Sequence, residues 1–335
     1  MSDPKAILVV GVGSIGERHL RCFQATGRAR LALCDTNEDL RRRVAEKYGI
    51  ESTYASLDEA LTDRHDAAVI ATPAQIHVPM AIRLAQAGLH LLVEKPVSTS
   101  LDRVDDLQEA LRAGGLTAVV AYVLRFHPAL EAMKRAIDSG RFGEPVQLVS
   151  SAGQHFPTYR PAYREIYYTD HATGGGAIQD ALTHMVNAGQ WLVGPIDSLV
   201  ADAAHQVLEG VEVEDTVGLL ARHGRVLASY SLNQHQAPNE WTLTVVCRRG
   251  TARFELHEHR WRWMTEPDGP WHEETFGPLE RDTMFVAQAS AFLDCIEGKA
   301  PAVCTLDEGI ATLRANLAAL ASVRERRWQE TRGVK

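Results

Sequence analysis

The chain has 335 residues, of which 45% are hydrophobic and 23% are charged, and its formal net charge is −8. This composition excludes a disordered chain, and no apolar stretch reaches the roughly 18 residues of a membrane helix. The acidic balance argues against a broad surface for nucleic acid. Five scattered cysteines without a C-x-x-C pair, and an N-terminus unlike a signal peptide, favour a reduced cytoplasmic protein.

The first third of the chain alternates short apolar runs with amphipathic stretches. The stretches predict helices, one of which starts with the capping box Ser56-x-x-Glu59 and another of which stops near Gly88. Such repeated strand–helix units predict a doubly wound parallel sheet with helices on both faces. The predicted strands cover residues 7–10, 31–34, 67–71, 90–93 and 117–121.

The pattern changes after about Tyr122, where successive strands with turn signals at His223-Gly224 and Arg249-Gly250 become typical. We therefore predict an α/β domain over residues 1–123 and an α+β domain with a large, mostly antiparallel open sheet over 124–335. The elements predicted in this second domain are a helix over residues 128–139, a strand over 146–150, strands over 199–264, and helices over 281–297 and 305–327.

A glycine-rich turn, Gly11-Val12-Gly13-Ser14-Ile15-Gly16, follows the first strand and opens the first helix. Its glycines permit a tight turn, close approach of a pyrophosphate, and packing of the helix on the strand. Asp35, followed by Thr36, ends the second strand, where a carboxylate can accept hydrogen bonds from an adenosine ribose. Since no arginine precedes Arg41 here, the pattern favours NAD over NADP.

Two further polar motifs follow later strands of the same sheet. Thr72-Pro73 with His77 follows one strand, and Glu94-Lys95-Pro96 follows the next. Open parallel sheets bind ligands at the carboxyl ends of their strands, which predicts that these residues lie at the ligand crevice, as candidate cofactor contacts, and that Lys95 is aimed into it. The alternative for Lys95 is an ordinary solvated lysine.

Asp180 and His184 lie four residues apart in a predicted helix over residues 177–192. This spacing places both side chains on one helix face, where Asp180 can orient His184 or stabilise its protonated form. Imidazole has a pKa suited to a general base. Three glycines before the helix would also permit close approach of a flat ligand. Considered alone, such a pair is more often solvated or capping.

An aromatic and arginine-rich loop covers residues 154–173. Tyrosines and arginines suit a polyhydroxylated or acidic ligand, although a surface or subunit-contact loop has the same composition. His257 and His259 alternate on a predicted strand, but no metal-ligand spacing accompanies them, so we predict no metal site. The predicted substrate-binding residues are Arg125, His155, Arg160, Tyr163 and Arg164.

Taken together, these motifs resemble the glucose-fructose oxidoreductase and inositol dehydrogenase (Gfo/Idh/MocA) family of NAD(P)-dependent enzymes. The resemblance covers residues 6–194. Its motifs are the glycine turn with His19, Thr72-Pro73 with His77, Ala87-Gly88-Leu89-His90 before Glu94-Lys95-Pro96, Arg125-Phe126-His127-Pro128, Gly143-Glu144-Pro145, Gly174-Gly175-Gly176 with Asp180 and His184, and Trp191-Leu192-Val193-Gly194.

The resemblance implies a Rossmann domain followed by a domain whose open sheet often forms a homodimer or homotetramer. It implies that Glu94-Lys95-Pro96 touches the cofactor, and that Lys95, Asp180 and His184 are catalytic. Family members often have an aspartate three residues after the histidine, where this chain has Asn187. The implied activity is hydride transfer between NAD and a ring hydroxyl or ketone of a sugar, sugar acid or cyclitol.

Two other functions stay open. Some relatives of the family keep NAD bound and use transient oxidation for elimination or glycoside cleavage, with no net redox change. A ligand-sensing protein could also keep this fold without catalysis. The joint presence of Lys95, Asp180 and His184 argues against the sensing function, because a binding module does not need those three groups.

Overall fold

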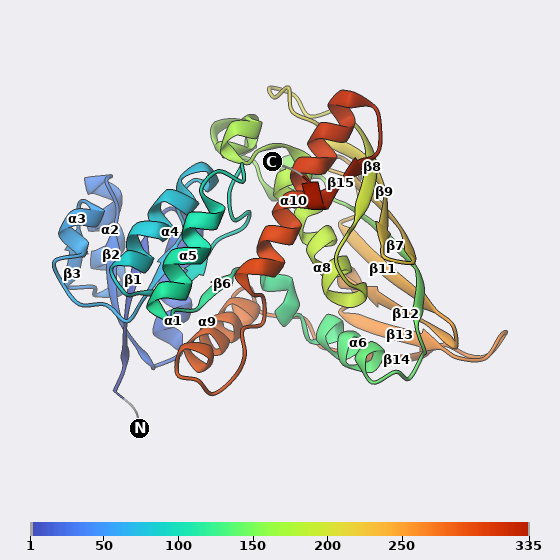
Figure 1. Ribbon diagram of the computed structural model, residues 1–335, viewed down its shortest axis with the longest axis horizontal. Coiled ribbons are helices and arrows are strands. Elements are labelled where there is room, and N and C mark those ends of the chain that lie inside the picture. Colours follow the sequence, from blue (N-terminus) through green and yellow to red (C-terminus); the bar gives the residue numbers. More distant parts are fainter. Residues whose placement is uncertain (1–2, 334–335) are drawn as a thin grey trace. The chain divides into compact units, whose positions relative to one another are not determined.

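The computed structural model describes residues 3–333, and these form two compact units (Figure 1). Unit 1 contains the residues up to Phe126 together with Leu279–Gly309. Unit 2 contains His127–Pro278 together with the residues from Ile310 onward. None of the helices between residues 3 and 333 is both long enough and apolar enough to cross a membrane.

Unit 1 is built on a six-stranded sheet in the order β3-β2-β1-β4-β5-β6, with every pair of neighbours parallel. Its central strands are apolar along their length because helices cover both faces. The predicted doubly wound sheet is confirmed, but β3 was missed because it has three residues, of which only Tyr54 is buried. The strands are β1 Lys5–Val10, β2 Ala29–Cys34, β3 Ser52–Tyr54, β4 Ala67–Ile70, β5 His90–Val93 and β6 Ala118–Val120.

Two helices of unit 1 have the boundary signals that the sequence predicts. Ser56 accepts a hydrogen bond from the Glu59 N–H, and the Glu59 carboxylate in turn accepts the Ala55 N–H, as in a capping box. Gly88 has φ 87°, a left-handed conformation that ends the preceding helix. The helices are α1 Ser14–Ala25, α2 Glu38–Tyr48, α3 Leu57–Ala60, α4 His77–Gln86, α5 Val104–Gly114 and α9 Thr283–Ile296.

Helix α9 corrects the predicted domain boundaries, which assigned all of residues 124–335 to the second domain. Its Phe292 and Leu293 are fully buried in the core of unit 1, and Phe292 packs edge-on against Phe23 of α1. Arg21 of α1 also forms an ion pair with Asp282, directly before α9. The sequence shows that α9 has an apolar face, but it cannot show which sheet that face covers.

Unit 2 is built on a nine-stranded sheet in the order β14-β13-β12-β11-β7-β10-β9-β8-β15. All neighbours are antiparallel except β7 and β10, which confirms the mostly antiparallel prediction. The strands are β7 Pro145–Gly153, β8 Ser198–Ala204, β9 Thr216–His223, β10 Val226–Asn233, β11 Glu240–Cys247, β12 Gly250–Glu255, β13 Arg260–Met264, β14 His272–Thr275 and β15 Gln329–Glu330.

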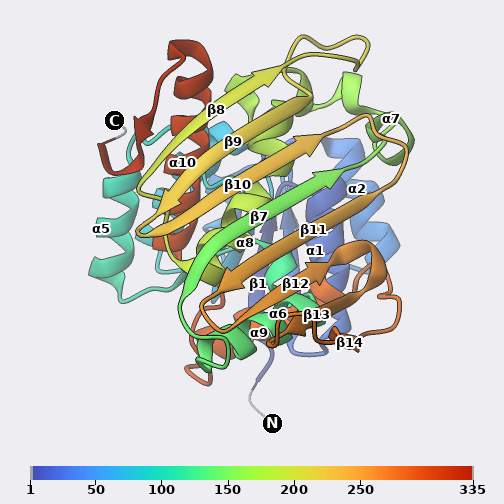
Figure 2. The same cartoon turned by 90° about the vertical axis from the view of Figure 1, so that its right-hand side faces the viewer.

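One face of this sheet packs against helices, and no helix within residues 3–333 lies in front of the other face (Figure 2). Strands β9 and β10 accordingly alternate between buried and exposed residues. The remaining α-helices of the described residues are α6 Pro128–Asp138, α7 Phe156–Tyr159, α8 Thr183–Val193 and α10 Leu306–Glu325.

The predicted strand through His257 and His259 is wrong. Leu256–Glu258 forms one turn of 3-10 helix, and His259 has φ 50°. The chain makes this tight connection because β12 and β13 are adjacent antiparallel strands. The two histidines therefore do not share the face of a strand.

His127, which precedes α6, is a buried imidazole. It is 1% exposed, and neither ring nitrogen has a hydrogen-bond partner within residues 3–333. Its ring stacks on that of His259 at 6.0 Å between centroids. Burial, helped by His259, lowers the pKa of His127 from its usual 6.5 to about 4. The folded chain therefore holds this ring neutral at pH values where the unfolded chain binds a proton.

We expect this residue to make the protein acid-sensitive. Its contribution to the free energy of unfolding should be complete above the unfolded-state pKa and should be lost as the pH falls toward about 4. The loss should reach about 3 kcal/mol. Urea unfolding at several pH values should show a shallower pH dependence for His127→Leu, whereas the exposed control His257→Gln should behave like the parent. Equal slopes for His127→Leu and parent would contradict this expectation.

Candidate active site

The glycine turn after β1 combines two glycines required by packing with one that packing does not require. Gly11 has φ 82°, and a Cβ there would lie 2.8 Å from the Ala71 carbonyl oxygen. A Cβ on Gly16 would lie 1.8 Å from the Gly11 carbonyl oxygen. A Cβ on Gly13 would meet nothing within 4 Å. Since α1 has no side-chain cap at this end, its N–H groups and the space beside Gly13 fit a pyrophosphate.

Asp35 is held in one orientation at the end of β2. One carboxylate oxygen accepts the Val12 N–H at 2.8 Å, and the other accepts the Asn37 N–H at 2.8 Å. The predicted neighbour Thr36 is exposed. Arg41, which the spacing placed beyond this site, donates to the Asp35 carbonyl oxygen at 2.7 Å. The carboxylate is thus fixed beside the glycine turn, as recognition of a ribose diol requires.

The motifs after β4 and β5 are joined by His77. Its Nε2 lies 2.7 Å from the Thr72 carbonyl oxygen, and its Nδ1 lies 3.0 Å from the Pro96 carbonyl oxygen. Burial lowers the pKa of His77. The Thr72 hydroxyl is buried with no hydrogen-bond partner in the described chain, which leaves it available to a ligand. Pro73, the other predicted cofactor contact here, is exposed.

The Glu94 side chain fixes the backbone of the motif that follows β5. Its carboxylate lies 2.7 Å from His19 Nε2 and accepts the Lys95 N–H at 3.0 Å. Burial opposes ionisation, but the bond to His19 and the charges of His19 and Lys95 hold the pKa of Glu94 below its usual value. Lys95 itself is half-buried. Glu94 therefore fixes the backbone from which the Lys95 side chain projects.

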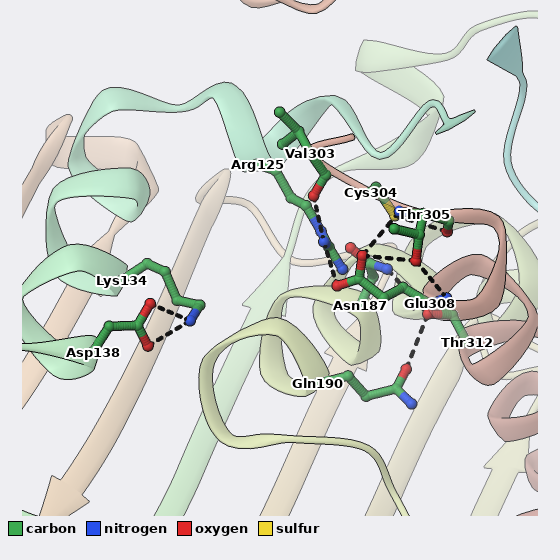
Figure 3. A network of polar contacts seen from close by, with 10 residues as sticks. All are labelled: Arg125, Lys134, Asp138, Asn187, Gln190, Val303, Cys304, Thr305, Glu308 and Thr312. Atoms are coloured by element: carbon green, nitrogen blue, oxygen red, sulfur yellow. Dashed lines mark hydrogen bonds and ion pairs between the residues drawn. The ribbon is translucent and has the colours of Figure 1, made fainter. Parts of the chain in front are cut away.

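Arg125 is buried in a polar network of unit 1 (Figure 3). Its guanidinium donates to the Val303 carbonyl oxygen and to the Glu308 carboxylate, both at 2.7 Å. At 3% exposure it offers little surface to a ligand. These contacts join the segment after β6 to the start of α10. Arg125 was predicted to bind substrate, and its partners in the structure are groups of the protein itself.

Asp180 and His184 lie on a helical segment of unit 2, but the first part of this segment has wider helical turns than the predicted helix. Ile178–Leu182 is a π-helix that continues directly into α8. Such π-helical turns occur often at functional sites. Asp180 is 4% exposed and accepts a hydrogen bond from the Tyr167 hydroxyl at 2.6 Å, whereas His184 is half-buried. Sequence reasoning did not single out Tyr167 for this role.

Asn187, at the position where relatives often have an aspartate, joins α8 to α10. Its amide donates to the Thr312 hydroxyl at 3.0 Å, and that hydroxyl donates to Gln190 at 2.9 Å (Figure 3). Asn187 is 1% exposed. The amide thus helps to hold the helix that contains His184.

The three glycines before this helix are explained in part by the protein itself. A Cβ on Gly175 would lie 2.3 Å from the Tyr168 carbonyl oxygen. Gly176 has φ 82°, and its Cβ would lie 2.6 Å from a carboxylate oxygen of Glu214. The expected close approach of a flat ligand is not needed to account for either residue.

The aromatic loop has a small core of its own. Tyr163 is 1% exposed, and its hydroxyl donates to the Glu209 carbonyl oxygen, as does the Arg164 guanidinium, each at 2.7 Å. These two predicted substrate contacts therefore attach the loop to the chain before β9. His155 and Arg160 are exposed and remain candidates for substrate binding. The core consists of Phe156, Tyr163, Tyr168, Leu208, Val211 and Val213.

Residues 5–122 match the family model of the GFO/IDH/MocA oxidoreductases with an NAD-binding Rossmann fold, and residues 130–253 match the model of the C-terminal domain of that family. The chain belongs to the GFO/IDH/MocA family. This membership confirms the predicted family and fold, and it establishes unit 1 as an NAD-binding domain.

Relatives of this GFO/IDH/MocA protein include inositol dehydrogenases. Inositol 2-dehydrogenase of Rhizobium meliloti is 27% identical over 95% of this chain and 97% of its own length. The match to inositol 2-dehydrogenase/D-chiro-inositol 3-dehydrogenase of Shouchella clausii, at 30% identity, covers 55% of this chain and about half of that protein, 52%.

Solved structures of the family have the same fold. The WlbA dehydrogenase from Bordetella pertussis, in complex with NADH and UDP-GlcNAcA, superimposes with a TM-score of 0.85 at 25% identity over 98% of both chains. Levoglucosan dehydrogenase in complex with NADH and levoglucosan gives a TM-score of 0.87 at 18% identity, covering 98% of this chain and 100% of the other.

The glycine turn allows cofactor binding to be separated from folding. We expect Gly13→Ala to change the free energy of unfolding of the cofactor-free protein by less than about 1 kcal/mol, but to weaken NADH binding at least about tenfold, because the methyl group occupies the space left for the pyrophosphate. Gly16→Ala, the matched control, should destabilise the cofactor-free protein by about 3 kcal/mol or more because of its clash with Gly11. Urea unfolding and NADH fluorescence titration measure the two effects. Parental NADH affinity in Gly13→Ala would exclude Gly13 from the cofactor site.

Proposed function

We propose that this chain is an NAD-dependent dehydrogenase that transfers a hydride between the nicotinamide and a ring hydroxyl or ketone carbon of a sugar, sugar acid or cyclitol. The observation that supports it most is the buried Asp180, held by Tyr167 and placed four residues before His184, in a chain whose other unit is an NAD-binding domain. The inositol and levoglucosan dehydrogenases among the similar proteins support the same substrate class.

Bound NAD⁺ would supply the hydride acceptor, and the fixed Asp35, the open space at Gly13 and the buried Thr72 hydroxyl suit its binding. The remaining work falls to side chains of this protein. His184 takes the hydroxyl proton as general base. Asp180, oriented by the Tyr167 hydroxyl, stabilises the resulting imidazolium. Lys95, projecting from a backbone fixed by Glu94, polarises the substrate oxygen.

The exposed residues of the aromatic loop are candidates for recognition of the substrate. The His155 ring contacts the Thr158 hydroxyl at 2.7 Å, and Arg160 is exposed. A guanidinium binds a carboxylate or two neighbouring hydroxyls in a fork, so Arg160 would favour an acidic sugar. Because the molecule has a net charge of −8, such a substrate depends on local positive groups.

We expect Lys95→Ala and His184→Ala each to lower kcat at least about 100-fold, because each removes a group that acts on the hydroxyl proton or oxygen. The assay follows NADH absorbance with inositols, xylose, levoglucosan and uronic acids as substrates. Calorimetric NADH titration of His184→Ala should give an affinity near that of the parent, which separates loss of chemistry from loss of the cofactor. Parental turnover in both variants would refute these roles.

We further propose that the protein is a cytoplasmic homo-oligomer that assembles through the helix-free face of the unit 2 sheet. The exposed residues Leu220, Val149 and Leu227 lie on the neighbouring strands β9, β7 and β10 of this face and are 40–54% exposed. Leu220 and Val149 flank Ser229 in one row across the strands. Such an apolar centre on an open sheet suits contact with a second copy. All five cysteines are free, in keeping with a reducing compartment.

The oligomer can be tested by placing charge on this face. Leu220→Asp together with Leu227→Asp should convert the parental dimer or tetramer to a monomer, because a carboxylate buried in an apolar contact is unpaired. Light scattering after size-exclusion chromatography gives the mass. Val207→Asp, at an exposed apolar residue of the same unit outside the sheet, is the control and should keep the parental mass. A monomeric parent would refute the proposal, as would a doubly substituted variant of unchanged mass.

A further inference from the structure

Glu214 is a buried acid that contacts the start of the helical segment containing Asp180 and His184. It directly precedes Asp215 and strand β9 and is 6% exposed. One oxygen of its carboxylate accepts the Ile178 N–H at 2.8 Å. Its carbonyl oxygen accepts the Ala177 N–H at 3.0 Å. A single residue from another element thus binds two successive N–H groups at the first turn of this segment.

The other carboxylate oxygen of Glu214 lies 2.5 Å from Nε2 of His171, whose side chain is 46% exposed. Between His171 and Ile178 the chain has a left-handed glycine, Gly176, where a Cβ would lie 2.6 Å from the Glu214 carboxylate. Gln179 adds a second attachment, because its amide donates to the His171 carbonyl oxygen at 2.9 Å. The chain from His171 to Ile178 is therefore wrapped around the Glu214 carboxylate.

The neighbouring acid, Asp215, supports the loop that contains Tyr167, the hydrogen-bond partner of Asp180. It is fully buried and accepts the N–H groups of Val207 at 2.7 Å and Leu208 at 2.8 Å. Burial alone would raise its pKa, but these bonds hold the pKa of Asp215 below its usual value. Leu208 belongs to the small core under the aromatic loop. The same loop contains Tyr167, whose hydroxyl donates a hydrogen bond to Asp180. Glu214 thus holds the helical segment that contains Asp180, and Asp215 holds the chain under the loop that contains its partner Tyr167.

We propose that Glu214 is a positioning residue for the proton-transfer step: with His171 as its counter-charge, it sets the placement of the Asp180 carboxylate relative to Tyr167 and His184. The inference rests on the proposed function, in which His184 is the general base. Glu214 acts through the backbone of the Gly174–Gly176 turn and the first helical turn, and it makes no contact with the reacting groups in this scheme.

The charge of the pair agrees with this role. The hydrogen bond to Glu214 raises the pKa of His171, and the negative charges of Glu214 and Asp170 add to the effect against the opposing effect of burial. His171 is therefore protonated to a higher pH than a free histidine. The ion pair it forms holds Glu214 against the turn while the carboxylate accepts the Ile178 N–H.

The experiment compares Glu214→Ala with Glu214→Gln and with Glu212→Ala, an exposed glutamate two residues earlier. In the NAD-loaded protein, Glu214→Ala should lower kcat about 10- to 100-fold, as loss of a supporting group commonly does. NADH affinity, measured by titration, should stay near the parental value. Glu214→Gln keeps the acceptor for Ile178 and should recover most of the activity, and Glu212→Ala should match the parent.

The pH profile separates positioning from general damage. A displaced Asp180 no longer stabilises the imidazolium of His184, so the acid limb of kcat/KM should move to lower pH in Glu214→Ala. Lower activity with an unmoved limb would overturn the inference, as would parental kcat. If Glu214→Ala does not fold, His171→Ala decides: it should lower kcat and move the limb in the same direction by less, and a parental profile would overturn the inference.

Failure of the proposed function is distinguishable from failure of this inference. An active His184→Ala variant refutes the general-base assignment, whatever the Glu214 variants do. An inactive His184→Ala variant together with a parental Glu214→Ala variant refutes only the positioning role.

Discussion

The free N–H groups at the start of a helix are the constraint on which both units depend. A helix leaves its first N–H groups without partners inside the helix, and they carry a partial positive charge. In unit 1 the start of α1 has no side-chain cap and faces open space at Gly13, so an anionic ligand can bind there. In unit 2 the segment before α8 receives the Glu214 carboxylate from within the chain. The first helix can therefore bind cofactor phosphates, whereas the second is left to position side chains.

Carboxylates that accept backbone N–H groups organise the candidate site in each unit, and two of the three, Glu94 and Asp215, are buried. Glu94 fixes the backbone of Lys95, Asp35 is held by the glycine turn, and Asp215 gathers the N–H groups of the chain before β9. Such groups are costly to bury unless their oxygens are paired, and each of these is paired with N–H donors.

Several predicted residues have partners that their sequence positions did not suggest. Arg125 and Tyr163 were grouped with substrate contacts because arginine and tyrosine suit sugars, but both are buried and bonded to the protein. Their partners, Glu308 and Glu209, are distant in sequence, and composition does not report such pairings. Tyr167 and Glu214 were missed for the same reason. The sequence signal that bears on Glu214 is Gly176, because a Cβ at that position would collide with the Glu214 carboxylate.

The sequence by itself determined the features that depend on neighbouring residues: every strand of unit 1 except β3, the glycine turn, Asp35 at the end of β2, and the four-residue spacing of Asp180 and His184. Steric limits on φ, helix periodicity and strand alternation act over a few residues, and they can therefore be predicted from the sequence of a single chain. The tertiary structure alone decided that α9 packs in unit 1, that β7 lies beside β10, and that Glu214 and Tyr167 meet the segment containing Asp180. These pairings join residues far apart in the chain, and they are selected by which apolar faces and unpaired polar groups satisfy one another after folding.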